Sequence, residues 1–474
     1  MELLLDIASY VFWVLVAITL LVFVHEMGHF LTAKLFGMRV ERFSVGFPPK
    51  IVGKQIGETE YVIGATPLGG YVKISGMVDE SMDTDMMESE PEPWEFRSKP
   101  VWQRIVVITA GVIFNVILAA FIFAGLKMTY GENYIPAENI EEVFVSEGSL
   151  AHQMGLRTGD RIVAVSGNPI ERYNDILDIG ALLADPMTLT VERGGKEQTF
   201  EGPDDIMTQL QRSEGSLGIH VEPTVVGAVV DDGAAAAVGI LPADRIVAID
   251  GEEVRFWNQM TERIQNVDAD GQLSLRFERP DSLVGAQDAS VALPPPVGRG
   301  VNGSIYEVSV APQYNEDQER YMIGVGGATP EMLFHVFGVR HKDYGVGEAI
   351  VSGVEDTWSN SAAIVTSLKR VVSGRDNFRE NVGGPVAIAK VTKEAADAGA
   401  PYFWRIVALL SITLAIMNIL PIPALDGGHL MFLIYEGITR REPSLRVRMV
   451  MQQVGMVVLL LLMVFLVFND ILRF

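Results

Sequence analysis

Four long apolar segments constrain the fold of this chain more than any other feature of its sequence. Each has about the 20 residues that an α-helix needs to cross the hydrocarbon core of a bilayer. They cover residues 7–30, 101–126, 403–420 and 449–468. Backbone polar groups must be satisfied internally inside a membrane, so segments of this kind form helices. The sequence therefore predicts a polytopic α-helical membrane protein with about four transmembrane helices.

The overall composition limits the possible partners and metal ligands. The 474 residues include 60 acidic and 37 basic side chains, which gives a formal net charge of -23. Such an acidic balance argues against a nucleic acid as partner, because phosphate binding needs a basic surface. The chain contains no cysteine, so disulfides and thiolate ligands are excluded, and His, Asp and Glu remain as metal ligands.

The first apolar segment ends with the sequence His25-Glu26-Met27-Gly28-His29. Residues four apart lie on one face of a helix, so His25 and His29 can bind one Zn²⁺ while Glu26 reaches a water molecule beside it. The alternative is that the motif has no function and is a helix with two surface histidines and a solvated glutamate. However, ionisable residues at membrane depth are costly and usually functional. The segment lacks the basic region and cleavage site of a signal peptide, so we expect it to be retained.

A carboxylate far along the chain is the candidate for the third metal ligand. A catalytic zinc site has three protein ligands and one open position, and Asp426 follows the third apolar segment in the stretch LPIPALDGG, residues 420–428. Prolines break the helix there, and broken helices are tolerated in membranes where they are buried in protein or line a wet cavity. The alternative is that Asp426 only caps the next helix. We expect His25, His29 and Asp426 to share one metal ion.

The region between the second and third apolar segments contains an internal repeat. Residues 151–167 and 235–251 align without a gap at an offset of 84 residues, and both contain the sequence DRIVA. An offset of this size corresponds to one small domain, so two tandem copies of about 90 residues are expected. Each copy predicts a short helix, a turn and a strand. The pattern resembles PDZ domains of bacterial proteases, whose groove accepts an extended peptide.

Basic residues in short loops predict the orientation of the four helices. They follow the third helix and flank the segment between helices one and two: Arg440, Arg441, Arg446, Arg448, Lys34, Arg39, Arg42, Arg97, Lys99 and Arg104. We expect these loops in the cytoplasm, the termini and repeats on the periplasmic side, and His25 and His29 near the cytoplasmic leaflet. The acidic residues 77–95 within the first loop are expected to be exposed.

Several motifs together resemble the site-2 protease family of intramembrane zinc metalloproteases. They are HEMGH in the first span, LDGG after the third, the two PDZ-like repeats, TPLGGYVK at residues 66–73 and GPVAIA at residues 384–389. The resemblance covers nearly the whole chain. It implies a multi-pass protein of the bacterial cytoplasmic (inner) membrane that cleaves transmembrane segments of single-span proteins. Such substrates include an anti-sigma factor already cut by another protease, and remnant signal peptides.

The resemblance also implies roles for individual residues. His25 and His29 match the first two zinc ligands of the family, Asp426 matches the third, and Glu26 matches the general base. Asn418 matches a family position that handles the substrate. Zn²⁺ is therefore the expected cofactor.

A membrane-associated β-hairpin is a further expectation from the resemblance, at residues 61–74, where it would pair with the unwound substrate. Substrate contacts are expected at Tyr61, Val62, Gly69, Gly70 and Val72. The pair Gly69-Gly70 is an ordinary signal for a hairpin turn. The chain departs from the family at Pro48 and Pro49, where a second glycine is expected, and this argues against backbone hydrogen bonding by that stretch.

These features divide the chain into five expected parts. They are residues 1–126 with helices one and two, HExxH and the hairpin; 127–222, the first PDZ-like α+β domain; 223–327, the second; 328–400, a linker with amphipathic helices; and 401–474, with helices three and four and LDGG.

Two other functions are compatible with some of the motifs. A PDZ-bearing membrane scaffold or chaperone with a vestigial metal site would not need the general base Glu26. A metal transporter would have no evident use for PDZ-like repeats. Zinc is favoured over iron for a hydrolytic site with two histidines and one carboxylate, although iron also uses such triads. Ordinary surface or partly packed roles are expected for His152, His220, His335, His341 and His429.

Overall fold

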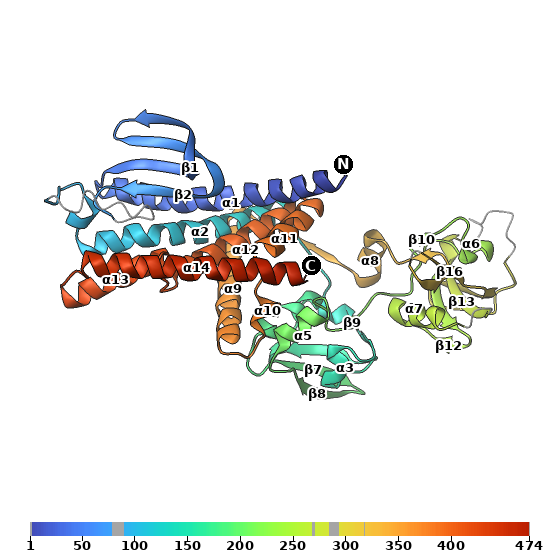
Figure 1. The fold of residues 1–474 in the computed structure, drawn as a ribbon. Coiled ribbons are helices and arrows are strands. Elements are labelled where there is room, and N and C mark those ends of the chain that lie inside the picture. The colour runs from blue at the N-terminus through green and yellow to red at the C-terminus, as the bar shows by residue number, and fades with distance from the viewer. Residues whose placement is uncertain (1, 78–89, 268–270, 284–292, 317, 474) are drawn as a thin grey trace. The chain divides into compact units, whose positions relative to one another are not determined.

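The computed structural model describes residues 2–77, 90–267, 271–283, 293–316 and 318–473. The chain separates into two compact units. Unit 1 contains the residues up to Glu132 and those from Asp343 onward, whereas unit 2 is Asn133–Lys342 (Figure 1). The unit that begins the chain is therefore completed by the residues that end it.

Unit 1 contains four described helices that are long and apolar enough to cross a membrane, as predicted. They are α1 Glu2–Leu35, α2 Val101–Tyr130, α12 Ala400–Ile419 and α14 Leu445–Arg473. The first three share one apolar core, in which Ala17, Ala119 and Val407 are fully buried. The shorter helices of the unit are α9 Val346–Val372, α10 Phe378–Asn381, α11 Pro385–Asp397 and α13 Asp426–Thr439. The chain is a multi-pass membrane protein.

Two long strands, β1 Val40–Ile56 and β2 Thr59–Ile74, form a sheet that packs against α1. Their register shows that both strands bend back on themselves. Phe43 of β1 lies opposite both Val72 and Tyr61, and Val62 of β2 lies opposite both Ser44 and Gly53. Across the sheet, the order of the paired segments is 70–74, 40–45, 60–63 and 53–56. The segment 70–74 is thus one edge of the sheet, and 53–56 is the other.

The turn signal at Gly69 and Gly70 does not correspond to the turn between β1 and β2, because both glycines lie inside β2. Close packing explains their presence. A Cβ on Gly70 would lie 2.7 Å from the carbonyl oxygen of Ser44, and a Cβ on Gly69 would overlap the ring of Phe47. Glycine within a strand permits a close approach of neighbouring groups, and the turn between β1 and β2 is formed at residues 57–58 instead.

The strand pairing is irregular around Pro48 and Pro49, the prolines that depart from the family pattern. The register of the sheet shifts between Phe47 and Lys50 on either side of them. Proline has no backbone N–H and cannot donate to a strand ladder. The interruption is the expected consequence of the two prolines.

The acidic segment 77–95 was expected to be exposed, and residues 78–89 lie outside the described part of the chain. At its end, Glu95 is buried and accepts a hydrogen bond of 2.5 Å from Arg97. The expectation of exposure is therefore wrong for Glu95.

Asp470, near the end of α14, holds the first turn of α11. Its carboxylate accepts hydrogen bonds from the backbone N–H groups of Gly384 at 2.9 Å and of Val386 and Ala387 at 3.0 Å. The first N–H groups of a helix have no partner within the helix itself. The GPVAIA segment thus attaches α11 to the last span.

Unit 2 contains the two repeats, each with its own sheet and apolar core. The first comprises β4 Phe144–Val145, α3 Leu150–Met154, β5 Arg161–Val165, β6 Asn168–Pro169, α4 Ile179–Leu182, β7 Thr188–Arg193, β8 Lys196–Glu201, α5 Ile206–Arg212 and β9 Ile219–His220. The second comprises β10 Ala228–Val229, α6 Ala234–Ala237, β11 Arg245–Ile249, β12 Glu252–Glu253, α7 Trp257–Gln265, β13 Leu273–Pro280, β14 Gly298–Arg299, β15 Gly303–Val310, β16 Gln313–Asn315, β17 Arg320–Met322 and β18 Val325–Gly326. The main sheets have the orders β6-β5-β7-β8 and β12-β11-β13-β15-β14. The PDZ-like fold stays a prediction.

An ion pair with a buried aspartate is repeated in both copies. Asp160 accepts hydrogen bonds of 2.6 and 2.7 Å from Arg193, and Asp244 accepts hydrogen bonds of 2.8 and 2.5 Å from Arg279. Each arginine also donates to the carbonyl oxygen of a glycine that follows the first helix of its copy. Arg193 donates to Gly155, after α3, and Arg279 donates to Gly239, after α6. The aspartates belong to the DRIVA sequences. The sequence repeat therefore corresponds to the same Asp–Arg ion pair in each copy.

Residues 328–400, expected to form a linker with amphipathic helices, contain α8 Pro330–Phe337, β19 Arg340–Lys342 and the helices α9 to α11. Phe337 and Leu333 of α8 pack against the core of the first repeat. The chain therefore returns to the first repeat after it has completed the second.

Candidate metal and catalytic site

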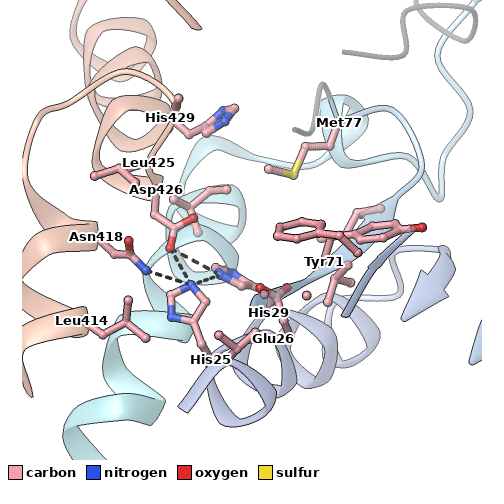
Figure 2. A pocket seen from close by; sticks show the side chains of 18 residues that line it. His25, Glu26, His29, Tyr71, Met77, Leu414, Asn418, Leu425, Asp426 and His429 are labelled. Carbon is pink, nitrogen blue, oxygen red and sulfur yellow. Dashed lines mark hydrogen bonds and ion pairs between the residues drawn. The ribbon is translucent and has the colours of Figure 1, made fainter. Parts of the chain in front are cut away.

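A cavity of about 190 Å³ lies within unit 1 and is lined by residues of α1, β2, α12 and α13. Its lining includes His25, Glu26, His29, Asn418 and Asp426, whose side chains are drawn in Figure 2. Both histidines are buried, with 7% and 8% of their surface exposed. The cavity thus brings together the residues for which the sequence predicts metal binding, proton transfer and a polar contact with the substrate.

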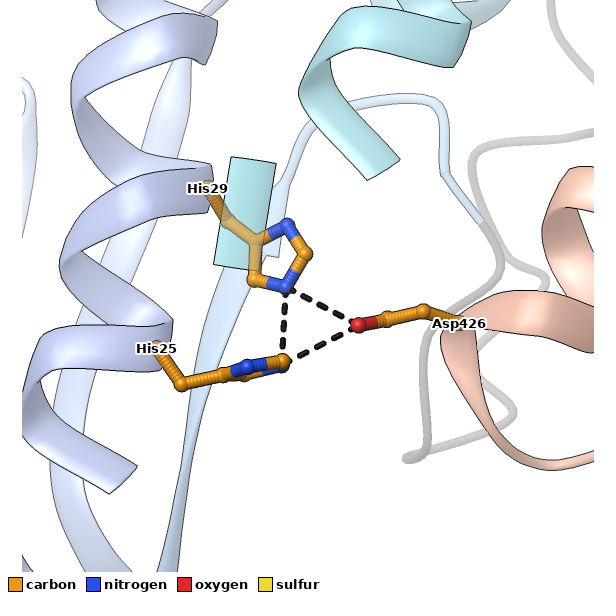
Figure 3. Close-up of side chains that lie close together, drawn as sticks. All are labelled: His25, His29 and Asp426. Carbon is orange, nitrogen blue, oxygen red and sulfur yellow. Dashed lines mark hydrogen bonds and ion pairs between the residues drawn. The ribbon is translucent and has the colours of Figure 1, made fainter. Parts of the chain in front are cut away.

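Three of these side chains converge on one point (Figure 3). The Nε2 atoms of His25 and His29 are 3.1 Å apart, and they lie 3.1 and 3.4 Å from Oδ2 of Asp426. Ligand atoms about 2 Å from a tetrahedral zinc are themselves roughly 3.3 Å apart, so these distances fit a zinc ion. Among the described residues, this is the one cluster of three His, Asp or Glu side chains found close enough to hold a metal.

Asp426 is the first residue of α13, and the helix is capped by Leu425 without a side-chain hydrogen bond. The capping role considered from the sequence is therefore not observed. Its buried Oδ2 has only the two Nε2 atoms as close polar neighbours and makes no further hydrogen bond within the described chain. A buried carboxylate oxygen is costly unless donors or a cation satisfy it, which suits a metal ligand.

The two glycines of LDGG allow α13 to begin close to the end of α12. A Cβ on Gly427 would overlap the carbonyl oxygen of Leu420, and a Cβ on Gly428 would lie 2.7 Å from the carbonyl oxygen of Ile422. The two glycines are thus packed closely against the broken segment that joins the two helices. This packing fixes the position of Asp426.

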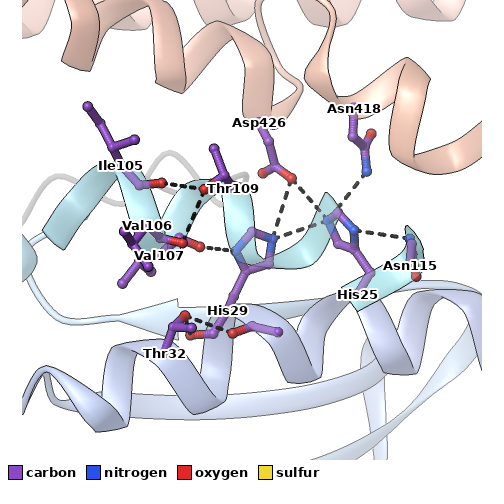
Figure 4. Close-up of polar contacts among 11 residues, drawn as sticks. His25, His29, Thr32, Ile105, Val106, Val107, Thr109, Asn115, Asn418 and Asp426 are labelled. Carbon is purple, nitrogen blue, oxygen red and sulfur yellow. Dashed lines mark hydrogen bonds and ion pairs between the residues drawn. The ribbon is translucent and has the colours of Figure 1, made fainter. Parts of the chain in front are cut away.

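Helix α2 supplies hydrogen-bond partners to the outer nitrogens of both imidazoles (Figure 4). Nδ1 of His29 lies 2.8 Å from the carbonyl oxygen of Val107, and Nδ1 of His25 lies 3.3 Å from Nδ2 of Asn115. Partners of this kind orient metal-binding histidines and fix the nitrogen that carries the proton. No role for α2 in the site could be predicted from the sequence, because its apolar residues do not reveal which face meets the metal site.

Gly111 is a further residue of α2 whose role could not be predicted from the sequence. A Cβ at this position would lie 2.5 Å from Nε2 of His29 and 2.7 Å from Nε2 of His25. Gly28, within HEMGH, allows α1 to approach α2 in the same way, since a Cβ added to Gly28 would lie 2.6 Å from the carbonyl oxygen of Ala110. Small residues at a crossing of membrane helices let the backbones approach closely. The signal available in the sequence was an Ala-Gly pair within an apolar span.

Glu26 and Asn418 approach the cluster from different helices. Glu26 follows His25 on α1 and lines the cavity beside Gly70, whose added Cβ would lie 3.3 Å from Cγ of Glu26. Asn418, near the end of α12, places its amide Nδ2 3.3 Å from Nε2 of His25. A carboxylate that can accept a proton and an amide that can donate a hydrogen bond therefore both line the cavity that contains the metal position.

The five expected substrate contacts on β2 divide into two groups. Gly69, Gly70 and Val72 line the cavity, together with Tyr71. Tyr61 and Val62 are not among the lining residues, because they lie on an inner segment of the sheet that is paired on both sides. The cavity is thus bordered by the edge segment of the sheet, and direct contacts through Tyr61 and Val62 are not supported.

His429 also lines the cavity, and its Nε2 lies 3.0 Å from Nε2 of Gln452 on α14. About two turns further along α13, Glu436 forms a buried ion pair with Arg104 of α2, with one hydrogen bond of 3.0 Å. This ion pair connects α13, which begins with Asp426, to α2, which contacts both imidazoles. The other histidines, expected to have ordinary roles, lie in unit 2: His152, His220, His335 and His341.

The model of peptidase family M50 matches residues 13–462 of the chain. The "Putative zinc metalloprotease" of Vibrio cholerae is 30% identical over 475 residues, which is 97% of each chain. The "Regulator of sigma-E protease RseP" of Escherichia coli is 30% identical over 490 residues, which is 99% of this chain and 98% of the relative. A "Putative zinc metalloprotease" of Xylella fastidiosa is 29% identical over 490 residues, with 98% and 99% covered.

These matches extend over both units and over the residues that line the cavity. The resemblance to the site-2 protease family is confirmed, and zinc is the cofactor of this enzyme. The chain belongs to peptidase family M50 and is a zinc metalloprotease.

Proposed function

We propose that this protein is an intramembrane endopeptidase that cleaves the transmembrane segments of single-span membrane proteins. The observation that carries the proposal is the position of the cluster of His25, His29 and Asp426. Its ligands come from a helix long and apolar enough to span a membrane and from the start of α13, directly after another such helix. A protease with its metal ligands on such helices reaches peptide bonds that a soluble protease does not.

The location follows from the distribution of basic residues in the short loops. We place the protein in the bacterial inner membrane, with unit 2 in the periplasm and the metal site near the cytoplasmic leaflet. Suitable substrates are an anti-sigma factor shortened by an earlier cut on the periplasmic side, or a remnant signal peptide.

The residues of the cavity have distinct parts in the proposed reaction. When zinc is bound, it acts as a Lewis acid and lowers the pKa of a water molecule to about 7. Glu26 accepts a proton from the attacking water and returns it to the leaving amine. Asn418 donates a hydrogen bond to the carbonyl oxygen under attack, a contribution of roughly 3 kcal/mol. The imidazoles and Asp426 hold the metal in place.

The edge segment 70–74 of the sheet offers a binding mode for the substrate. A helical substrate hides its peptide bonds in its own hydrogen bonds, so it must unwind before attack. An exposed strand edge can replace the lost bonds by β-augmentation. Because Gly70 and Val72 line the same cavity as Glu26, a strand added at this edge would lie beside the proposed base.

Replacing Val72 with proline is expected to lower turnover at least about tenfold with unchanged zinc content. Proline removes a backbone N–H from the edge and restricts the extended chain. The matched control is Val52→Pro, on the segment at the far side of the sheet, where Val52 is exposed and does not line the cavity. Equal turnover by the two variants, measured on a transmembrane peptide, would refute substrate binding at the edge segment.

Unit 2 is proposed to contain two PDZ-like domains that control which substrates reach the cavity. The domains either exclude substrates with bulky periplasmic parts or recognise a carboxyl terminus left by an earlier cut. Because unit 2 forms a compact body that does not supply the metal cluster, replacing residues 143–313 with a flexible linker is expected to retain zinc-dependent cleavage. The variant should cut an uncut substrate with a folded periplasmic domain as fast as a shortened one. A variant that still discriminates between them would contradict the gating role.

The direct test of the proposed function uses the full-length protein, purified in detergent with its zinc. A single-span peptide should be cut within its apolar segment, as located by mass spectrometry, and a zinc chelator should stop the reaction until zinc is returned. A scaffold or chaperone with a vestigial metal site would bind the peptide without cutting it. Cleavage confined to the flanking polar residues would refute intramembrane proteolysis.

A further inference from the structure

Asn115 is a polar residue buried in the middle of α2, and it lies against a proposed zinc ligand. Its exposed fraction is 0%, and its Nδ2 is 3.3 Å from Nδ1 of His25. Its backbone carbonyl accepts a hydrogen bond of 2.8 Å from the hydroxyl of Ser411 on α12. An amide at this depth is costly to bury, so its hydrogen bonds matter.

The ring nitrogen that faces Asn115 determines whether His25 can bind a metal. A neutral imidazole carries one proton, so Nε2 is free for zinc when the proton is on Nδ1. Nδ1 then becomes a donor and needs an acceptor. His29 has such an acceptor in the carbonyl oxygen of Val107 at 2.8 Å.

Asn115 can provide the acceptor for His25. Its Oδ1 is buried and has no hydrogen-bond partner within the described chain. A half-turn of the terminal amide exchanges Nδ2 and Oδ1, and the oxygen then faces Nδ1 of His25. With Nδ2 in that place, the amide would instead favour a proton on Nε2, the nitrogen that faces Asp426. The amide is thus able to serve both the zinc-free and the zinc-bound tautomer.

We infer that Asn115 is a positioning residue that holds the proton of His25 on Nδ1 and so leaves Nε2 to the zinc ion. The inference rests on the proposed role of His25 as a zinc ligand. An amide performs this task without placing a further negative charge at membrane depth, where a carboxylate would be costly. The competing acceptor is the backbone of Gly111, which also lies within hydrogen-bonding reach of the His25 ring.

The test is the zinc affinity of full-length variants in detergent, measured by competition with a chelator. Asn115→Leu, which keeps the size of the side chain but removes its acceptor, should raise the Kd for zinc by about 10- to 100-fold. Asn115→Asp, which can only accept, should bind zinc within a few-fold of the unaltered protein. The matched control is Thr109→Val on the same helix, because the hydroxyl of Thr109 bonds only to carbonyls of its own helix among the described residues.

A spectroscopic measurement separates this role from simple packing. In zinc-loaded protein with ¹⁵N-labelled histidine, the Nδ1–H of His25 should give a slowly exchanging proton signal that is lost in Asn115→Leu and retained in Asn115→Asp. The inference is overturned if Asn115→Leu binds zinc as tightly as the unaltered protein, since the backbone of Gly111 would then suffice. It is also overturned if the Leu and Asp variants lose zinc equally.

A control on His25 distinguishes failure of this inference from failure of the proposed site. His25→Ala should lose zinc whatever the role of Asn115. If His25→Ala binds zinc normally, the metal assignment itself is wrong. Each variant is first compared with the unaltered protein by thermal unfolding in the zinc-free state, so that a loss of fold is not mistaken for a loss of zinc.

Discussion

Replacing Glu26 with glutamine is expected to lower the rate of peptide cleavage by roughly 100- to 10,000-fold, the range for loss of a general base. Glutamine has almost the same shape as glutamate and can still form hydrogen bonds, but it cannot accept the proton of the attacking water. Glu26 is not among the three side chains that converge on the metal position, so the variant should retain its zinc. The measurement combines turnover of a single-span peptide with the zinc content of the purified protein.

The matched control for this experiment is Glu355→Gln. Glu355 is an exposed residue of α9 in the same unit, and its change to glutamine removes the same charge without touching the cavity. This variant should cleave at the normal rate. A Glu26→Gln variant that retains both zinc and full activity would exclude Glu26 as the base, and a variant that loses zinc would place Glu26 among the ligands.

Replacing Gly111 with alanine is expected to weaken zinc binding by at least about 100-fold, at the upper end of the losses caused by disturbing the surroundings of metal ligands. The added methyl group would lie 2.5 and 2.7 Å from the two Nε2 atoms that face the metal position. Both imidazoles, or α2 itself, would have to move. Because the site depends on distances of 3.1 to 3.4 Å between ligand atoms, such a movement should also abolish cleavage.

Gly125 provides the control for this substitution within the same helix. A Cβ on Gly125 would meet no heavy atom within 4 Å, so Gly125→Ala should leave zinc affinity and turnover unchanged. Alanine favours a helix over glycine by about 1 kcal/mol in both variants, and the comparison removes this common effect. Equal zinc affinity for the two variants would show that α2 does not determine the geometry of the site.

The parts of the site that could be predicted from sequence depend on local spacing or on the free-energy cost of placing a charged side chain within a membrane. His25 and His29 are four residues apart, and a helix alone places them on one face. Asp426 was a candidate because a carboxylate at membrane depth, beside helix-breaking prolines, costs free energy and is usually retained for a function. Neither argument requires knowledge of the tertiary fold, and the structure brings these three residues together.

Other features depend on how distant segments pack, and sequence reasoning failed there. Gly69 and Gly70 have the composition of a turn, but in the fold they allow Phe47 and the backbone of Ser44 to come close. Gly111 and Asn115 lie in an apolar span whose residues do not indicate which face meets α1. How closely two helices approach depends on the side chains of both, and the sequence of one helix does not show which helix it will pack against.

The order in which the site residues occur along the chain has a consequence for synthesis. A ribosome makes α1 and α2, with both imidazoles, long before it makes Asp426, and all of unit 2 is synthesised in between. A nascent chain therefore lacks the carboxylate and the Glu436 partner that fastens it to Arg104. The cluster of three metal ligands therefore cannot be completed before α13 has been synthesised.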